Sequence, residues 1–393
     1  MRSSTLASLF GLSVMLALSP SVPADIVFIG KASIPGNTAD KSGLTDLVGD
    51  KVPHNRLGAF GSAIDYTGQG DLYLAVTDRG PGDGAAAYHP RLQTFRIAIN
   101  PGSERPVEVE LVATTILTDP EGRPFSGFSG HLDPSGPERL DPEGLRLSRS
   151  GTLFIAEEYG PFIDEFSRDG KRLRRLPVPE TFTIAHPAAD PRQEQPPRNT
   201  SGRMPNRGFE GLALGPDGRT IWTMVQSPLI QDGALGPDGK RAGRHCRILE
   251  LNIDTGQSRQ WIYTLDSPRH GVSEILCISD RELLVLERDG EGGKDARSRQ
   301  IYKVDVSRAT DVSGAKSLPS GALPANIRAG TKTLWLDLMD PRFGLAGAEM
   351  PEKIEGLCFG PTLPDGRRTL IITSDNDMKP DQPSWFWVFA FGS

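Results

Sequence analysis

Cysteine and histidine are scarce in this chain, with three and six of them among 393 residues. The histidines show no ligand spacing and no two cysteines lie close in sequence, so a zinc site is not expected. Three cysteines leave at least one thiol unpaired. Cys277 and Cys358 both fall within predicted strands, where we expect a buried thiol that acts as a small apolar side chain.

Long apolar runs are absent beyond the N-terminus. There, Arg2 precedes an apolar stretch over residues 6–18 and a small-residue cleavage site at residues 22–24, which predicts a secretory signal peptide over residues 1–24. The stretch is too short for a membrane anchor, and no cysteine follows the cleavage site to carry a lipid. We therefore expect residues 25–393 to form one exported domain, periplasmic or secreted.

An excess of positive charge is missing as well. The net charge of −6 and the isoelectric point near 5.6 argue against a nucleic-acid partner. We expect a monomer that acts on a small anionic molecule and has no membrane contact once the signal is removed. The 44 glycines and 33 prolines suit many turns between short strands, and helical periodicity is nearly absent.

The sequence does contain a short repeat, which is present in five copies. A polar residue is usually followed by a small one, apolar residues stand two and four places on, and a turn and a second strand follow. Repetition at this length is typical of a radial array of four-stranded sheets, and it predicts an all-β fold, a β-propeller of five blades with six as the alternative. The copies open at Ser62, Glu143, Glu210, Ser273 and Glu355.

Short β-rich runs separated by turn residues give each blade its predicted strands. The last blade offers only three, so we expect residues 25–34 to supply its fourth strand and close the ring. Two long segments interrupt the pattern, residues 118–140 and 187–205, and we expect both to be surface loops. The predicted strands are 61–66, 71–77, 94–99 and 107–117; 144–147, 152–156, 163–166 and 172–178; 211–214, 220–225, 247–252 and 260–265; 274–278, 282–286, 300–306 and 333–338; and 356–360, 369–373 and 384–391.

A ring of sheets brings the first residue of every copy to one axis. The carboxylates of Glu143, Glu210 and Glu355 would repel one another there, and a hard divalent cation with oxygen ligands would relieve that conflict. We therefore predict a Ca²⁺ site formed by the five opening residues, in which Glu274 is an alternative to its neighbour Ser273. The competing interpretation is that Glu-Gly is turn chemistry at the blade starts, with each Glu solvated.

The second strand of each blade returns to the same mouth and ends on polar residues, among them Asp78, Glu158 and Asp375. Several cations also fall near this mouth. Arginine suits capture of phosphate or carboxylate oxygens, which favours an anionic substrate, although each cation could instead pair with a neighbouring carboxylate. The cations are Arg56, Arg79, Arg207, Arg288 and Lys353.

Four stretches of the chain resemble a known family of exported bacterial proteins described as having esterase-like activity of phytase. The resemblance covers nearly all of residues 25–393 and implies a β-propeller with acidic functional residues and a phosphoester-cleaving activity. A looser similarity to the calcium-dependent apyrases, five-bladed propellers that hold Ca²⁺ with one Ser or Glu per blade, implies the same five ligands. The matching stretches are Val76–Gly80, Leu140–Leu145 with Glu157 and Glu158 downstream, Asn206–Leu212, and Lys353–Leu357 with Ser374–Asp377.

Together these observations predict metal-assisted hydrolysis of a phosphate ester. The ion would polarise a phosphoryl oxygen, Arg79 and Arg207 would stabilise developing charge, and Asp78, Glu158 or Asp375 would orient or deprotonate water. Two alternatives stay open: a non-enzymatic binding propeller with a structural Ca²⁺, and a lactonase or carboxylesterase on the same scaffold.

Overall fold

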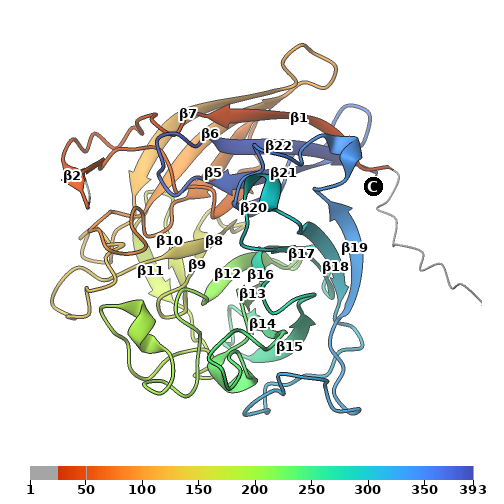
Figure 1. Ribbon diagram of the computed structural model, residues 1–393. Coiled ribbons are helices and arrows are strands. Elements are labelled where there is room, and N and C mark those ends of the chain that lie inside the picture. Colours follow the sequence, from red (N-terminus) through yellow and green to blue (C-terminus); the bar gives the residue numbers. More distant parts are fainter. Residues whose placement is uncertain (1–24, 50, 393) are drawn as a thin grey trace, which may run out of the picture.

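Five four-stranded antiparallel sheets surround a central axis in the computed structural model, which describes residues 25–49 and 51–392 (Figure 1). The proposed signal peptide, residues 1–24, lies outside the described residues. The prediction of an all-β propeller is confirmed, with five blades rather than six. From the axis outward, four blades are β4 (Ala63–Tyr66), β5 (Leu72–Val76), β6 (Arg91–Ile99) and β7 (Val107–Ile116); β8 (Pro142–Leu147), β9 (Leu153–Glu157), β10 (Phe162–Phe166) and β11 (Arg172–Arg175); β12 (Phe209–Leu214), β13 (Thr220–Val225), β14 (His245–Asn252) and β15 (Ser258–Thr264); and β16 (Gly271–Cys277), β17 (Glu282–Arg288), β18 (Arg299–Asp305) and β19 (Thr331–Asp337).

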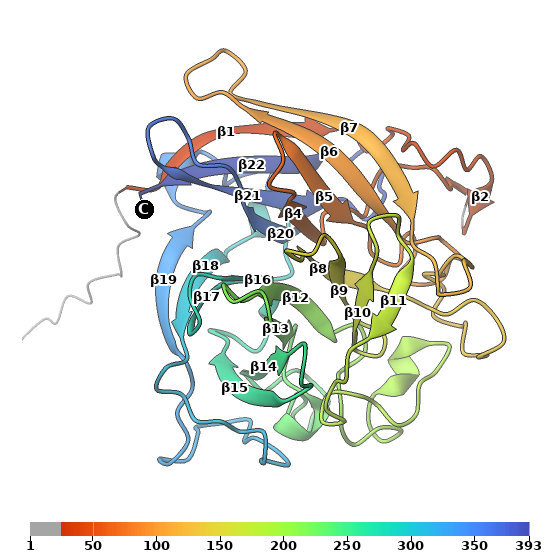
Figure 2. The ribbon, with the colours of Figure 1, turned by 180° about the vertical axis from the view of Figure 1, so that it is seen from behind.

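The N-terminal strand closes the ring, as the sequence predicts. The fifth blade consists of β20 (Lys353–Phe359), β21 (Arg368–Asp375), β22 (Ser384–Phe391) and β1 (Val27–Ile34). In this blade β1 pairs antiparallel with β22, from Val27 opposite Ala390 to Ile34 opposite Ser384 (Figure 2). Because the first and last parts of the chain share one sheet, neither end of the ring is left as an open edge.

Alternating side chains explain why the blades pack as they do. In each opening strand, the apolar residue two places after the polar one is fully buried between neighbouring blades. Consecutive opening strands contact each other around the whole ring, which brings all five to the axis. The five buried side chains are Ile64, Leu145, Leu212, Ile275 and Leu357.

Most predicted strands are found within about three residues of their predicted bounds, and two of the differences have a clear cause. β6 begins at Arg91 rather than at residue 94, because the buried Arg91 guanidinium pairs with Asp40 at 2.7 Å and is held inside the sheet. β11 ends at Arg175 rather than at residue 178, since Pro177 lacks the amide hydrogen that a strand needs. A short hairpin, β2 (Leu47–Val48) with β3 (Val52–Pro53), stands apart from the blades.

The two predicted long loops are ordered against each other beside the second blade. Ser129 Oγ donates to the Ala189 carbonyl at 2.7 Å, and the buried Arg203 pairs with Glu194 at 2.7 Å. Glu194 ends η1 (Pro191–Glu194); the other 3-10 helices within residues 25–49 and 51–392 are η2 (Ile230–Asp232), η3 (Gly293–Asp295) and η4 (Pro341–Phe343). No helix in these ranges is long and apolar enough to cross a membrane. Cys246, Cys277 and Cys358 are free thiols.

Candidate functional site at the channel mouth

A register irregularity marks the opening polar residue of four of the five blades. Pairing with the second strand skips Glu143 in β8, Glu210 in β12, Ser273 in β16 and Glu355 in β20. Each is therefore the extra residue of a β-bulge, which removes it from the ladder and redirects its side chain. Such bulges explain how a polar residue on the packing face of a strand turns into the channel. Ser62 directly precedes β4, whose ladder has no such irregularity.

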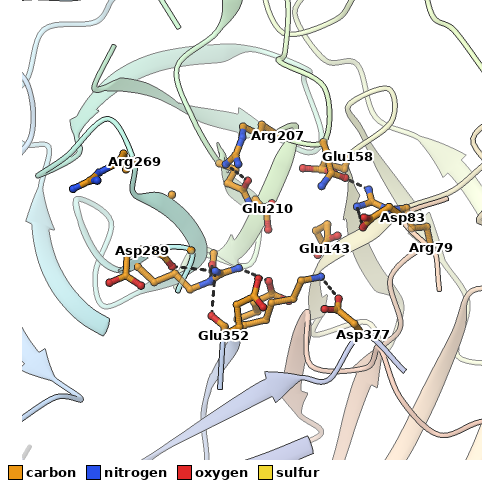
Figure 3. A pocket seen from close by; sticks show the side chains of 18 of the residues that line it. Arg79, Asp83, Glu143, Glu158, Arg207, Glu210, Arg269, Asp289, Glu352 and Asp377 are labelled. Carbon is orange, nitrogen blue, oxygen red and sulfur yellow. Dashed lines mark hydrogen bonds and ion pairs between the residues drawn. The ribbon is translucent and has the colours of Figure 1, made fainter. Parts of the chain in front are cut away.

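The redirected side chains line a polar pocket of about 340 Å³ at the channel mouth (Figure 3). Seven of the ten predicted site residues line it, namely Arg79, Glu143, Glu158, Arg207, Glu210, Ser273 and Glu355. Figure 3 shows Glu143, Glu158 and Glu210 around one central space. Ser62, Asp78 and Asp375 are buried and are not among the lining residues.

Three carboxylates in this region are close enough to share one ion. One oxygen each of Asp141, Glu143 and Glu158 lies within 4.8 Å of the others. Asp141, at the start of the second blade, is fully buried and accepts a hydrogen bond from the Arg79 amide at 3.0 Å. Asp141 was not among the predicted site residues. Among the five openings of the repeat, only the second is preceded by Asp-Pro, and this departure from the repeat was the available signal.

Glu143 is the most exceptional member of this acidic cluster of Asp141, Glu143 and Glu158. Its side chain is buried, yet no described residue donates a hydrogen bond or an ion pair to its carboxylate. Burial raises the pKa of Glu143 well above its ordinary value, and the neighbouring carboxylates of Glu210 and Asp141 raise it further. A carboxylate held at the pocket wall without a donor, beside two further carboxylates, favours a bound cation.

Glu210 extends the acidic cluster from the third blade. Burial raises its pKa well above the ordinary value, and Glu158 adds to that shift by charge repulsion. The Gln226 amide donates to Glu210, and Arg207 in turn donates to the Gln226 oxygen at 2.5 Å. The glutamine therefore separates the arginine from the glutamate, and Arg207 keeps its charge available to the pocket.

Ser273 and Glu355 are joined by Arg288 instead of facing the pocket unpaired. The Arg288 guanidinium donates to Ser273 Oγ at 3.0 Å and to the Glu355 carboxylate at 2.7 Å. A cation at the acidic cluster would need Arg288 to release these two groups before they could become ligands. Four of the five predicted ligands thus lie around one mouth, but in two differently bonded sets.

The alternative ligand Glu274 points into the ring instead of the pocket. It forms a buried ion pair with Arg146 at 3.1 Å and accepts from the Leu212 amide at 2.9 Å. The structure therefore brings Ser273, and not Glu274, to the pocket wall. Ser62 Oγ is buried and has no hydrogen-bond partner among the described residues, which leaves its oxygen free to accept another contact.

Asp78 and Asp375, two of the predicted acid–base residues, lie side by side next to Lys353. Burial raises the pKa of Asp375 to about 7, and burial together with Asp375 raises the pKa of Asp78 well above its ordinary value. Lys353 lies 3.5 Å from the Asp375 carboxylate and also pairs with Asp377. Of the three predicted bases, only Glu158 lines the pocket; its role as a base stays a prediction.

Arg79 forms ion pairs with three carboxylates. It pairs with Asp141, with Glu158 at 3.2 Å and with Asp83 at 3.4 Å. Arg56, by contrast, donates to the Met378 carbonyl at 3.2 Å and does not line the pocket. The acidic cluster holds two more carboxylates than guanidinium groups when Arg79 is included, a charge that suits a divalent cation with oxygen ligands.

Comparison with known proteins agrees with the fold and the motifs. The profile of the phytase-like family described as esterase-like activity of phytase matches residues 55–378. An uncharacterized secreted protein of Arthroderma benhamiae is 28% identical over 366 residues, covering 74% of this chain and 69% of the relative.

Solved structures show only distant likeness. A gluconolactonase of Xanthomonas campestris has a TM-score of 0.39 at 12% identity, covering 95% of this chain and 97% of the other. A calcium-binding regucalcin of Agrobacterium tumefaciens has 0.38 at 13%, covering 86% and 92%. The tail fibre of Staphylococcus aureus phage P68 has 0.39 at 10%; the match covers 93% of this chain, which spans about half of the fibre chain (52%). Likeness at this level says nothing about activity.

Proposed function

The chain belongs to the phytase-like family described as esterase-like activity of phytase, and on this premise we propose that it is an exported, Ca²⁺-dependent hydrolase. Its substrate is a phosphate ester or a related anionic ester, cleaved at the mouth of the propeller channel. Export is supported by the predicted signal peptide and by the relative described as secreted.

One observation carries the proposal: Glu143 is a buried carboxylate without a described donor, beside two further carboxylates and facing a polar pocket. Asp141, Glu143 and Glu158 would hold the ion, and Glu210 could complete the oxygen set. Ca²⁺ accepts six to eight oxygen ligands and tolerates irregular geometry, which fits side chains supplied by different blades. When bound, the ion supplies Lewis acidity, which polarises a phosphoryl oxygen and lowers the pKa of water.

Side chains of this protein would bind the developing negative charge, interact with the attacking water and position the carboxylates that hold the ion. Arg207 has no carboxylate partner among the described residues, so it can bind the oxygens on which negative charge develops. Glu158 lines the pocket and, as one of the carboxylates that would hold the ion, is the candidate to orient the attacking water by accepting a hydrogen bond from it. Arg79 is already bonded to Asp141 and Glu158, so we assign it the task of positioning these two carboxylates.

The test is phosphate release from a panel of phosphate monoesters and diesters by the mature protein, with Ca²⁺ and with a chelator. We expect activity only with the ion, and a loss of at least about 100-fold in Glu143→Gln, which removes one ligand charge. Glu104→Gln is the matched control, because Glu104 is exposed and makes no described ion pair.

Two results would contradict the proposal. One is activity that is indifferent to both the chelator and Glu143→Gln. The other is turnover of lactones in the same assay without any phosphate release, which would make the protein a lactonase on the same scaffold.

A further inference from the structure

The pocket contains two kinds of basic side chain. Arg79, Arg288 and Lys353 are each paired with a carboxylate, as described above. Arg241 and Arg269, like Arg207, line the pocket without forming an ion pair with any described residue. Neither arginine was singled out in the sequence, because both stand in loops outside the repeated unit.

These two unpaired arginines lie together on the side of the third blade. Arg241 belongs to the loop between η2 and β14, and Arg269 to the loop that leads from β15 to β16. The Arg241 guanidinium donates to the Arg269 carbonyl at 3.0 Å and to the His270 carbonyl, which joins the two loops. Figure 3 shows Arg269 across the pocket from Arg79, on the far side of Glu210.

The positively charged Arg241 and Arg269 lie beside Arg207 in the pocket, and none of these guanidinium groups forms an ion pair with a described residue. Partial burial and the nearby Arg207 charge lower the pKa of Arg241 to about 10. The Arg269 guanidinium makes no hydrogen bond with any described residue, so all its donors remain available. An anion between Arg241 and Arg269 would relieve this repulsion and fill those donors.

We propose that Arg241 and Arg269, beside Arg207, form a second anion-binding subsite opposite the acidic cluster. The substrate therefore carries a second anionic group, a phosphate or a carboxylate, besides the ester that is cleaved. The conclusion about the substrate rests on the proposed function, whereas the subsite itself is measurable without catalysis.

The experiment is calorimetric titration of the full-length mature protein with inorganic pyrophosphate and, separately, with citrate, both in the presence of a chelator. We expect at least one of these anions to bind, and Arg269→Gln to weaken that binding about tenfold, the effect of losing one charged hydrogen-bond donor. Arg269→Gln removes no described contact of the side chain, so the fold is retained. Arg241→Gln should act in the same direction.

Arg244→Gln is the matched control: Arg244 is exposed, lies three residues from Arg241, does not line the pocket, and its loss changes the net charge equally. Unchanged anion binding in Arg269→Gln and Arg241→Gln would overturn the subsite, as would the absence of binding to the wild-type protein. A loss of anion binding in Arg244→Gln equal to that in Arg269→Gln would also overturn it.

The outcome is separable from that of the proposed function. Failure of the hydrolase proposal appears as absent or chelator-insensitive phosphate release, measured without reference to these arginines. Failure of the subsite appears in the titration alone. If both the hydrolase and the subsite proposals hold, Arg269→Gln lowers kcat/KM for an ester that carries a second phosphate about tenfold relative to kcat/KM for phenyl phosphate.

Discussion

Arg146 and Glu274 form a buried ion pair at the centre of the ring, with 3.1 Å between their charged atoms. The Arg146 guanidinium also donates to the carbonyls of Ile64, Ile275 and Leu357, which belong to the opening strands of three other blades. Glu274 accepts from the Leu212 amide of the remaining blade. One pair thus bonds all five blades together.

We expect Glu274→Gln to lower the free energy of unfolding by about 1–3 kcal/mol, because it removes the ion-pair partner of the buried Arg146 and leaves Asp65 as the nearby carboxylate. Chemical denaturation of the metal-free protein measures this change. Arg149→Gln removes an exposed arginine three residues away and should shift the free energy by no more than about 0.5 kcal/mol. Equal stability of Glu274→Gln and the wild type would show that the central pair does not hold the blades together.

Close packing between blades explains why a small residue follows the opening polar residue, and it yields a second prediction. A Cβ added to Gly211 would lie 2.6 Å from the Ile275 amide of the next blade, too close for any real contact. Gly211→Ala should therefore destabilise the protein by about 1–3 kcal/mol through overpacking, visible as a lower thermal midpoint. At Gly314 an added Cβ meets nothing within 4 Å, so Gly314→Ala is the control that should leave the midpoint nearly unchanged.

The repeat explains which parts of the molecule were predictable from sequence. Five copies of similar polarity, 63 to 82 residues apart, indicate five blades, and the missing strand of the last blade indicates closure by β1. The convergence of Glu143, Glu210, Ser273 and Glu355 on one mouth follows from the same repetition.

Pairing across blades was not predictable, because it depends on side-chain reach between segments far apart in the chain. The bond from Arg288 to Glu355 joins residues 67 positions apart, and that from Arg79 to Asp141 joins residues 62 apart. Arg241 and Arg269 stand in loops that follow no repeat, so no pattern marked them. The departure at Glu274 was visible as a broken repeat, but its partner Arg146 was not.

The raised carboxyl pKa values predict that ion binding strengthens with pH. Glu143 and Glu210 hold protons above their ordinary range when no cation is present, and a bound ion needs the ionised form. Ca²⁺ affinity should therefore rise with pH, and binding should release protons. Calorimetry at one pH in two buffers of different ionisation enthalpy measures the protons released. Binding without proton release in the wild type would contradict the explanation that Glu143 and Glu210 hold protons in the metal-free protein.

The same shifts set the pH dependence of stability in the absence of ions. A carboxyl group whose pKa is raised by folding contributes stability below its unfolded pKa, near 4.5 for Glu, and that contribution is lost as the pH rises through the folded value. Since folding raises the pKa of Asp375 from its ordinary 3.8 to about 7, this group should make the metal-free protein lose stability between pH 3.8 and 7. Denaturant midpoints over this range, with chelator, check the sign.

Glu143→Gln separates the effect of the Glu143 charge on the stability of the metal-free protein from its effect on Ca²⁺ binding. In the metal-free protein the substitution removes an unpaired carboxylate from beside Asp141 and Glu158, so the free energy of unfolding should rise by about 1 kcal/mol. In the wild type, Ca²⁺ at 100 times its dissociation constant should add about 2.7 kcal/mol, a gain that Glu143→Gln loses. Glu104→Gln should respond to the ion as the wild type does. Thermal unfolding of the three proteins, with and without Ca²⁺, gives all of these values, and a Glu143→Gln protein still stabilised fully by the ion would place the cation elsewhere.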